Sequence, residues 1–149
     1  MKKIYLDTSV ISAYNDIREL EKLEQTKDFF KKANQDADIY VSTLVKDEVS
    51  AIKNIERKKD LNTLISKYKS LTITDEINQL AEYYIKNELI PDSHIEDAVH
   101  LAIATVNEMD LLISWNYTHL VKLKTRHLVN ALNLVSGYKE IEIILPIEY

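Results

Sequence analysis

Apolar and polar residues follow one another along the chain in blocks that predict alternating strands and helices. Short apolar runs bounded by polar residues predict buried strands. The longer segments between them carry apolar residues three and four positions apart, which is the spacing of amphipathic helices. The predicted strands cover residues 4–6, 38–42, 71–73, 111–114 and 140–145, and the predicted helices cover about 10–13, 17–34, 43–52, 56–69, 75–90, 93–106 and 125–135.

Polar residues at the expected helix ends support these boundaries. Ser42 or Thr43 and then Thr74 are side chains that cap helix N-termini. The run Ser93-His94-Ile95-Glu96 matches a capping box. Gly137 follows the last helix, where glycine commonly ends a helix.

The alternation of strands and helices predicts an α/β fold with three layers. Each gap between strands can hold a crossover helix, which favours a central parallel sheet of about five strands flanked by helices. The 149 residues contain no linker, repeat or low-complexity tract, so we expect a single domain over residues 1–149. Ligands of such sheets bind beyond the carboxyl ends of the strands.

Composition narrows the chemistry that this fold can carry. One Gly and no Cys exclude Gly-rich phosphate loops, thiol catalysis and Cys-based metal sites. No apolar run approaches the roughly 20 residues of a membrane span, and the start Met1-Lys2-Lys3 is not followed by a signal-peptide core. We therefore expect a cytoplasmic protein without a membrane partner, whose chemistry rests on carboxylate, imidazole, hydroxyl and amine groups.

Three carboxylates and one amide lie where a shared site is expected. Asp7 directly follows the first strand, where it either caps the next helix or faces a ligand. Glu48 shares a helix face with apolar residues, which is costly unless the carboxylate reaches water, is paired or binds a cation. Asp97 belongs to a helix that is apolar almost all round, and a buried unpaired carboxylate either takes up a proton or holds a metal. Asn116 follows the strand 111–114 as a turn residue or an oxygen donor.

Oxygen donors of this kind select Mg²⁺ or Mn²⁺ rather than zinc. A divalent ion in an open carboxylate site suits phosphodiester hydrolysis, because it activates water and offsets phosphate charge. The histidines add no zinc motif of the His-Glu-x-x-His form. We interpret His100 as a hydrogen-bonded core residue supporting the site rather than a ligand, and we expect His119 to face the same cleft.

The net charge of −5 hides an uneven distribution. Residues 46–69 carry a net charge of +3 and residues 111–139 one of +4, whereas residues 70–110 carry −8. The basic segments are either ordinary solvated helix faces or surfaces that attract nucleic acid. Trp115 either stacks on a base or packs beneath the rim of the cleft. The candidate substrate contacts are Lys53, Arg57, Trp115, His119, Lys122, Lys124 and Arg126.

Four segments together resemble the PIN domain, the small metal-dependent nuclease fold of VapC-type toxins. They are Ile4–Val10, Ser42–Val49, Ile95–Ala104 and Leu111–Asn116, and they occur in the order of the family across nearly the whole chain. Each motif alone is weakly specific, whereas the four in succession are distinctive.

The resemblance implies a ligand set and an activity. It implies Asp7, Glu48 and Asp97 as ligands of Mg²⁺ or Mn²⁺, with Asn116 as a further ligand or positioning group. Ser9 and Ser114 match hydroxyl positions that support the ligands. The family's chemistry is cleavage of RNA by activated water, which leaves a 5′-phosphate and a 3′-hydroxyl. Many members have Asp where this chain has Asn116, and the loss of one negative charge predicts weaker binding of a second metal.

Our main hypothesis is a Mg²⁺- or Mn²⁺-dependent endoribonuclease, the toxin of a toxin–antitoxin pair. Its partners would be an RNA substrate, a small antitoxin protein and a second copy in a homodimer. One alternative is a PIN fold that has lost catalysis and serves as a binding or scaffolding module. Asn116 and the negative net charge of the chain favour this alternative. Another is a metal-dependent phosphatase of small substrates.

Overall fold

A parallel sheet of five strands forms the centre of the molecule. The computed structural model describes all residues, 1–149, and its strands pair in the order β3-β2-β1-β4-β5, every pair parallel. The chain therefore winds outward from β1 in one direction and then, from β4 on, in the other. This confirms the predicted α/β class with a five-stranded parallel sheet. The strands are β1 (Lys2–Leu6), β2 (Ala37–Ser42), β3 (Lys69–Leu71), β4 (Leu111–Ile113) and β5 (Glu142–Ile144).

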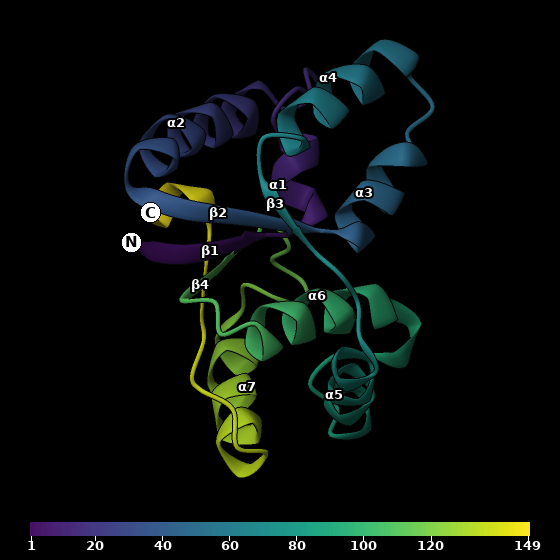
Figure 1. Cartoon of the computed structure of the whole chain (residues 1–149), viewed down its shortest axis with the longest axis vertical. Helices are drawn as coiled ribbons and strands as arrows, with labels where there is room; N and C mark the ends of the chain where they lie inside the picture. Colours follow the sequence, from purple (N-terminus) through teal and green to yellow (C-terminus); the bar gives the residue numbers. More distant parts are fainter.

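Helices cover both faces of this sheet, so the molecule has three layers (Figure 1). Alternate residues of β1 point to opposite faces, as a strand requires: Ile4 and Leu6 belong to one buried cluster and Tyr5 to the other. One layer holds α1 (Thr8–Ala13), α2 (Leu20–Asp36), α3 (Thr43–Ser50) and α4 (Ile55–Ile65). The other holds α5 (Asp75–Lys86), α6 (Ile95–Val106) and α7 (Leu123–Val135).

The predicted caps at Ser42, Thr74 and Gly137 occur where the sequence places them, whereas the helices predicted over 56–69 and 75–90 end earlier, at Ile65 and Lys86. Ser42 accepts the backbone N–H of Val45 at the start of α3, and Thr74 caps α5 in the same way. Gly137 has φ of +82°, and the N–H of Tyr138 donates to the carbonyl of Asn133 at 2.8 Å. This pattern closes α7 with a left-handed glycine.

The predicted capping box at Ser93–Glu96 is wrong. Residues Asp92–His94 form a short 3₁₀ turn, η1, and α6 begins only at Ile95, with no side-chain cap. The hydroxyl of Ser93 lies 2.9 Å from Nδ1 of His94, so it is engaged by a side chain and does not cap the helix. A second 3₁₀ turn, η2, covers Pro146–Glu148. None of the helices combines the length and the hydropathy that crossing a bilayer requires.

Candidate active site at the carboxyl edge of the sheet

Asp7 lies directly after β1, and its buried carboxylate is enclosed by donors. Ser9 and Ser114 each donate a hydroxyl to it at 2.5 Å, one to each oxygen, and the N–H of Val10 donates at 3.3 Å. The residue is only 3% exposed. Burial raises the pKa of Asp7 above its usual value, and the charge of His100 and the two hydroxyls offset this effect only in part. Asp7 therefore caps α1 and also lies at the strand end where a ligand is expected.

Glu48 reaches the same edge of the sheet from the middle of α3. One of its oxygens accepts the hydroxyl of Thr8 at 2.8 Å and lies 2.8 Å from Nε2 of His100. Partial burial would raise the pKa of Glu48, but the hydrogen bond and charge of His100 and the hydroxyl of Thr8 outweigh it and hold the pKa below its usual value. This carboxylate is therefore held in its charged form.

His100 connects Glu48 to a buried chain of hydrogen bonds. Its Nδ1 lies 2.7 Å from the hydroxyl of Tyr5, which in turn lies 2.8 Å from Oγ of Ser42. His100 is 3% exposed and Tyr5 is fully buried. Burial raises the pKa of Tyr5 well above its usual range, so its hydroxyl keeps its proton. The interpretation of His100 as a hydrogen-bonded core residue is confirmed.

Asp97 is paired, and the expectation of an isolated buried carboxylate is wrong. It lies in the first turn of α6, where one oxygen is 2.9 Å from Nδ1 of His119, and its side chain is 19% exposed. The N–H of His119 donates to Oδ1 of Asn116 at 3.0 Å, and the N–H of Asn116 donates to Oγ of Ser114 at 2.9 Å. His119 thus faces the site as expected, and Asn116 braces the turn that carries it.

These contacts bring the predicted residues together at one edge of the sheet. Ser114 binds Asp7 and also begins the chain of contacts that leads through Asn116 to Asp97. Thr8, the neighbour of Asp7, binds Glu48. Asp7 is therefore linked to Glu48 through its neighbour Thr8, and to Asp97 through Ser114, Asn116 and His119 in succession.

The donor chemistry of this group fits a hard divalent cation. Glu48 and Asp97 each use one carboxylate oxygen in the contacts with Thr8, His100 and His119, which leaves the other oxygen without a protein donor. However, no group of three or more Asp, Glu or His side chains is already gathered closely enough to hold an ion. The carboxylates are instead held apart by separate hydroxyl and imidazole partners.

Sequence reasoning missed the hydrogen bonds that Tyr5, Thr8 and Ser42 make within the site. A tyrosine in an otherwise aliphatic strand was the available signal, because a buried phenol usually needs a hydrogen-bond partner. Thr8 and Ser42 carried no comparable signal, since hydroxyl residues are common at helix starts, where Ser42 caps α3 and Thr8 is the first residue of α1.

Trp115 is not a surface for stacking on a base. It is 6% exposed and packs in the core beneath α2, where its indole N–H donates to Thr26 at 2.9 Å. Lys22 lies over the ring, 5.6 Å from its centroid. The alternative interpretation, an aromatic packed beneath the rim, is the one that the structure bears out.

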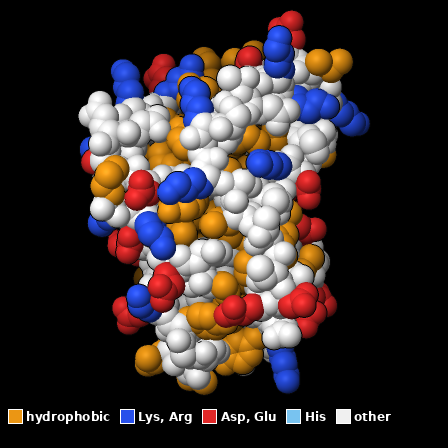
Figure 2. Space-filling view, viewed as in Figure 1, with side chains coloured by type: hydrophobic (Ala, Val, Ile, Leu, Met, Phe, Trp, Pro, Cys, Tyr) orange, Lys and Arg blue, Asp and Glu red, His pale blue; other side chains and the backbone are white.

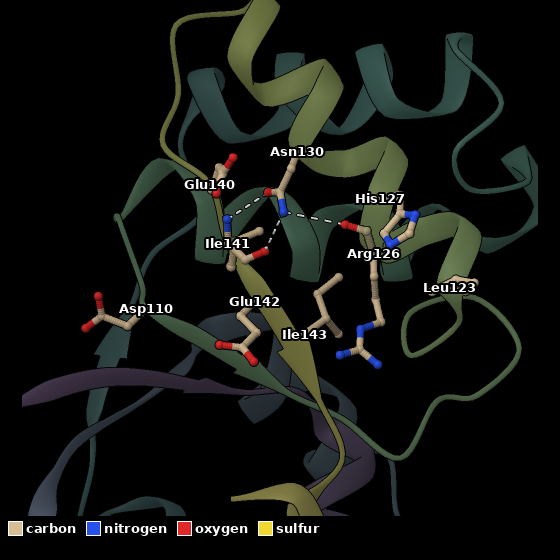
Figure 3. A pocket seen from close by; sticks show the side chains of 9 residues that line it. All are labelled: Asp110, Leu123, Arg126, His127, Asn130, Glu140, Ile141, Glu142 and Ile143. Carbon is tan, nitrogen blue, oxygen red and sulfur yellow. Dashed lines mark hydrogen bonds between the residues drawn. The ribbon is translucent and has the colours of Figure 1, made fainter.

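Two predicted substrate contacts lie away from the site carboxylates. The guanidinium of Arg57 donates to the carbonyl and hydroxyl of Ser12 and to Asn15 at 2.6–2.9 Å, so it fastens α4 to α1. Arg126 lines a separate pocket of about 530 Å³ together with Glu142 and Ile143, and none of the site carboxylates line this pocket (Figure 3).

The other candidate cations are free at the surface. Lys53, Lys122 and Lys124 are exposed. Lys and Arg are the more frequent charged side chains over α2 and α4 in Figure 2, whereas Asp and Glu are the more frequent over the α5–α7 layer. The basic segment 46–69 begins on α3, the helix that carries Glu48. It therefore adjoins the candidate site.

Comparisons with known proteins agree with this arrangement. A family model described as PIN domain matches residues 4–138. The chain belongs to the PIN domain family. The match covers all four carboxylate and amide positions of the candidate site, β1 from Ile4 on, and the whole of β2, β3 and β4. No curated protein matches this PIN domain.

Solved structures share the fold at low sequence identity. VapBC2 from Rickettsia felis bound to a promoter DNA fragment has a TM-score of 0.62 at 10% identity, covering 96% of this chain and 98% of the other. DNA-bound VapBC from Salmonella typhimurium has a TM-score of 0.59 at 15% identity, covering 98% and 99%. Mycobacterium tuberculosis VapC20, described as a toxin that cleaves the sarcin-ricin loop, has a TM-score of 0.59 at 14% identity, covering 93% and 98%. These similarities establish the fold of the PIN domain described here.

Proposed function

We propose that this PIN domain is a Mg²⁺- or Mn²⁺-dependent endoribonuclease and the toxin of a toxin–antitoxin pair. The observation that carries the proposal is the convergence of Asp7, Glu48 and Asp97, through their hydrogen-bond partners, at the carboxyl edge where the winding of the sheet reverses. The toxin–antitoxin complexes with the same fold support the biological setting.

Each proposed role follows from the contacts of the residue. Asp7, Glu48 and Asp97 would hold the metal, and a bound divalent ion would supply an activated water and offset the charge of the phosphate. The hydroxyls of Ser9 and Ser114 hold Asp7, His100 holds Glu48, and His119 holds Asp97.

Asn116 acts in this proposal by positioning the turn of His119, since its amide oxygen already accepts a backbone N–H. The exposed side chains of Lys53, Lys122 and Lys124 would attract the RNA backbone without reading its sequence.

Cleavage of a structured RNA by the purified protein tests the proposal. We expect cleavage in Mg²⁺ or Mn²⁺, none in excess chelator, and loss of at least 100-fold in rate in Asp97→Asn. Glu96→Gln is a matched control, because Glu96 is the exposed neighbour of Asp97 in the same turn of α6 and makes no side-chain contact there. Circular dichroism checks that both variants fold. Cleavage by Asp97→Asn at the rate of the parent would refute the assignment.

A binding module without catalysis is the second candidate. It is favoured by the separate partners that hold the three carboxylates apart and by the engagement of Asn116. Calorimetry with millimolar Mn²⁺ distinguishes the two, because a module without a metal site gives no binding heat. Hydrolysis of mononucleotides in place of RNA would indicate the phosphatase.

The partners are proposed on the same basis. An antitoxin would be a small protein that binds this PIN domain and abolishes its cleavage of RNA, and co-expression of a neighbouring short gene tests for it. Light scattering of the purified chain tests the expected homodimer. The cytoplasmic location stays a prediction, which fractionation of cells checks.

A further inference from the structure

A second pocket lies beside the candidate site, on the α2 side of the turn that follows β4. It has a volume of about 530 Å³ and is bounded by the first turns of α2, by the turn carrying Trp115 and Tyr117, and by η2 near the C-terminus. This volume falls within the range of about 300–1,000 Å³ that is typical of small-molecule sites. The pocket therefore suits a single compact group rather than a helix or a folded surface.

The wall of this pocket is built into the candidate site. The N–H of Trp115 donates to Oγ of Ser9 at 2.8 Å, and Ser9 donates to Asp7 at 2.5 Å. Trp115 and Tyr117 line the pocket, whereas Asn116 between them makes its contacts on the site side of the turn. An RNA strand whose phosphate reaches Asp7 thus has this pocket as its neighbour.

Tyr117 gives the pocket a free aromatic face. It is 54% exposed and its hydroxyl makes no hydrogen bond to another protein group, unlike that of Tyr5. The ring of Trp115 lies near it, tilted by 51°, with the centroids 6.3 Å apart. Leu20 and Ile147 add apolar walls that are 62% and 60% exposed. Exposed aromatic rings beside a nucleic-acid site serve as stacking platforms for unpaired bases.

The polar groups of the pocket do not suit a phosphate. Its one cation, Lys22, is paired with Glu19 at 2.9 Å and lies over Trp115. Glu21 and Gln25 have no side-chain partner and line the same wall. A carboxylate is a hydrogen-bond acceptor that matches the exocyclic amino group of a base. The charges therefore favour the uncharged part of a nucleotide.

We propose that this pocket binds an unpaired base of the RNA substrate, stacked on Tyr117 and selected for an exocyclic amino group by Glu21. The inference rests on the proposed ribonuclease function and specifies how that site selects its substrate. It predicts a preference for adenine or cytosine over uracil next to the cleaved bond, because uracil presents a carbonyl where the other two bases present an amino group.

Trp115 is the only tryptophan in the chain and lines the pocket, so its fluorescence reports occupancy. The purified protein is titrated with AMP, CMP and UMP in excess chelator, which separates binding from cleavage. We expect AMP and CMP to change the emission at lower concentration than UMP. Tyr117→Ala should weaken the binding of AMP about 5- to 150-fold, the range of one base stacked on an aromatic ring.

Paired variants make the test specific. Glu21→Gln should remove the preference for AMP and CMP over UMP, and Glu24→Gln, an exposed acid of the same helix outside the pocket, should leave it intact. Equal affinity for all three nucleotides, or full affinity in Tyr117→Ala, would overturn the proposal. So would a Tyr117→Ala variant that binds nucleotides normally but loses self-association, because the pocket would then be a protein interface.

Failure of this inference and failure of the proposed function have different signatures. RNA cleavage that depends on Asp97 but is indifferent to Tyr117 and Glu21 contradicts the base pocket alone. Selective nucleotide binding by a protein that cleaves no RNA supports the pocket and contradicts the ribonuclease.

Discussion

The buried hydroxyl of Tyr5 is the link through which the core fixes Glu48, and Tyr5→Phe isolates its contribution. Phenylalanine keeps the ring and removes only the oxygen. The lost contacts are those to Ser42 at 2.8 Å and to Nδ1 of His100 at 2.7 Å. Ser42 keeps a partner, since its hydroxyl oxygen also accepts the N–H of Val45 at 3.2 Å. His100 loses the sole partner of its Nδ1.

The loss of stability in Tyr5→Phe is therefore the cost of leaving Nδ1 of His100 buried without a hydrogen-bond partner. An unpaired buried polar group costs about 1–3 kcal/mol, and we expect the free energy of unfolding to fall by that amount. His100 would also be free to turn or change tautomer, which would loosen its contact with Glu48. Removing the partner of a residue that orients a metal ligand typically weakens metal affinity about 10- to 100-fold, so Mn²⁺ binding should weaken as well.

Denaturant unfolding and calorimetry with Mn²⁺ measure the two effects separately. Tyr84→Phe is the matched control, because Tyr84 is also fully buried and bonds Thr105 and Asn133, none of which contacts a carboxylate of the site. It should lose similar stability and keep the Mn²⁺ affinity of the parent. A stable Tyr5→Phe, or an equal loss of Mn²⁺ affinity in both variants, would refute the reasoning.

Two further predictions concern stability away from the site. The hydrogen bond from Arg18 lowers the pKa of Asp16 from 3.8 to about 2, so this pair stabilises the folded state above about pH 4 and loses that effect as the pH falls toward 2. Unfolding measured against pH should show a shallower acid loss in Asp16→Asn, and an unchanged slope would contradict this. Gly137→Ala should lower the free energy of unfolding by about 1 kcal/mol, because its φ of +82° is unfavourable for a residue with a side chain. The loss would be backbone strain alone, since the added Cβ would meet no atom within 4 Å. Ser136→Ala, its neighbour, should change the unfolding midpoint little, and equal midpoints for the two variants would rule out backbone strain.

Short-range patterns predicted the elements of the fold well. The apolar runs at β1, β2 and β4 and the helix caps Ser42 and Thr74 were all read correctly. Strand and helix periodicity and end capping depend on residues a few positions apart, so they are visible in the sequence. The capping box at Ser93 failed because the neighbouring imidazole of His94 competes for the same hydroxyl.

The sequence predicted which residues bring oxygen ligands to the candidate site, but not the contacts that those residues make. Asp7 and Asn116 could be placed at strand ends because the carboxyl ends of parallel strands lie along one edge. The same reasoning left Asp97 without a partner, although His119, 22 positions away, lies 2.9 Å from it. Trp115 directly follows a strand, a position where an aromatic side chain can lie at the surface. Its side chain instead packs beneath α2 and donates to Thr26.

The sequence by itself determined the order of the elements, the parallel sheet and the oxygen chemistry of the site, because these depend on local periodicity and residue type. Tertiary structure decided that Glu48 meets His100, that the buried Tyr5 bonds His100, and that Tyr117 lines a pocket while Asn116 contacts Ser114 and His119. The bonded residues are separated by tens of positions in the sequence. Asn116 and Tyr117 are neighbours that differ only in the direction of their side chains. Only the packing of two helix layers on one twisted sheet fixes which residues come within hydrogen-bond distance.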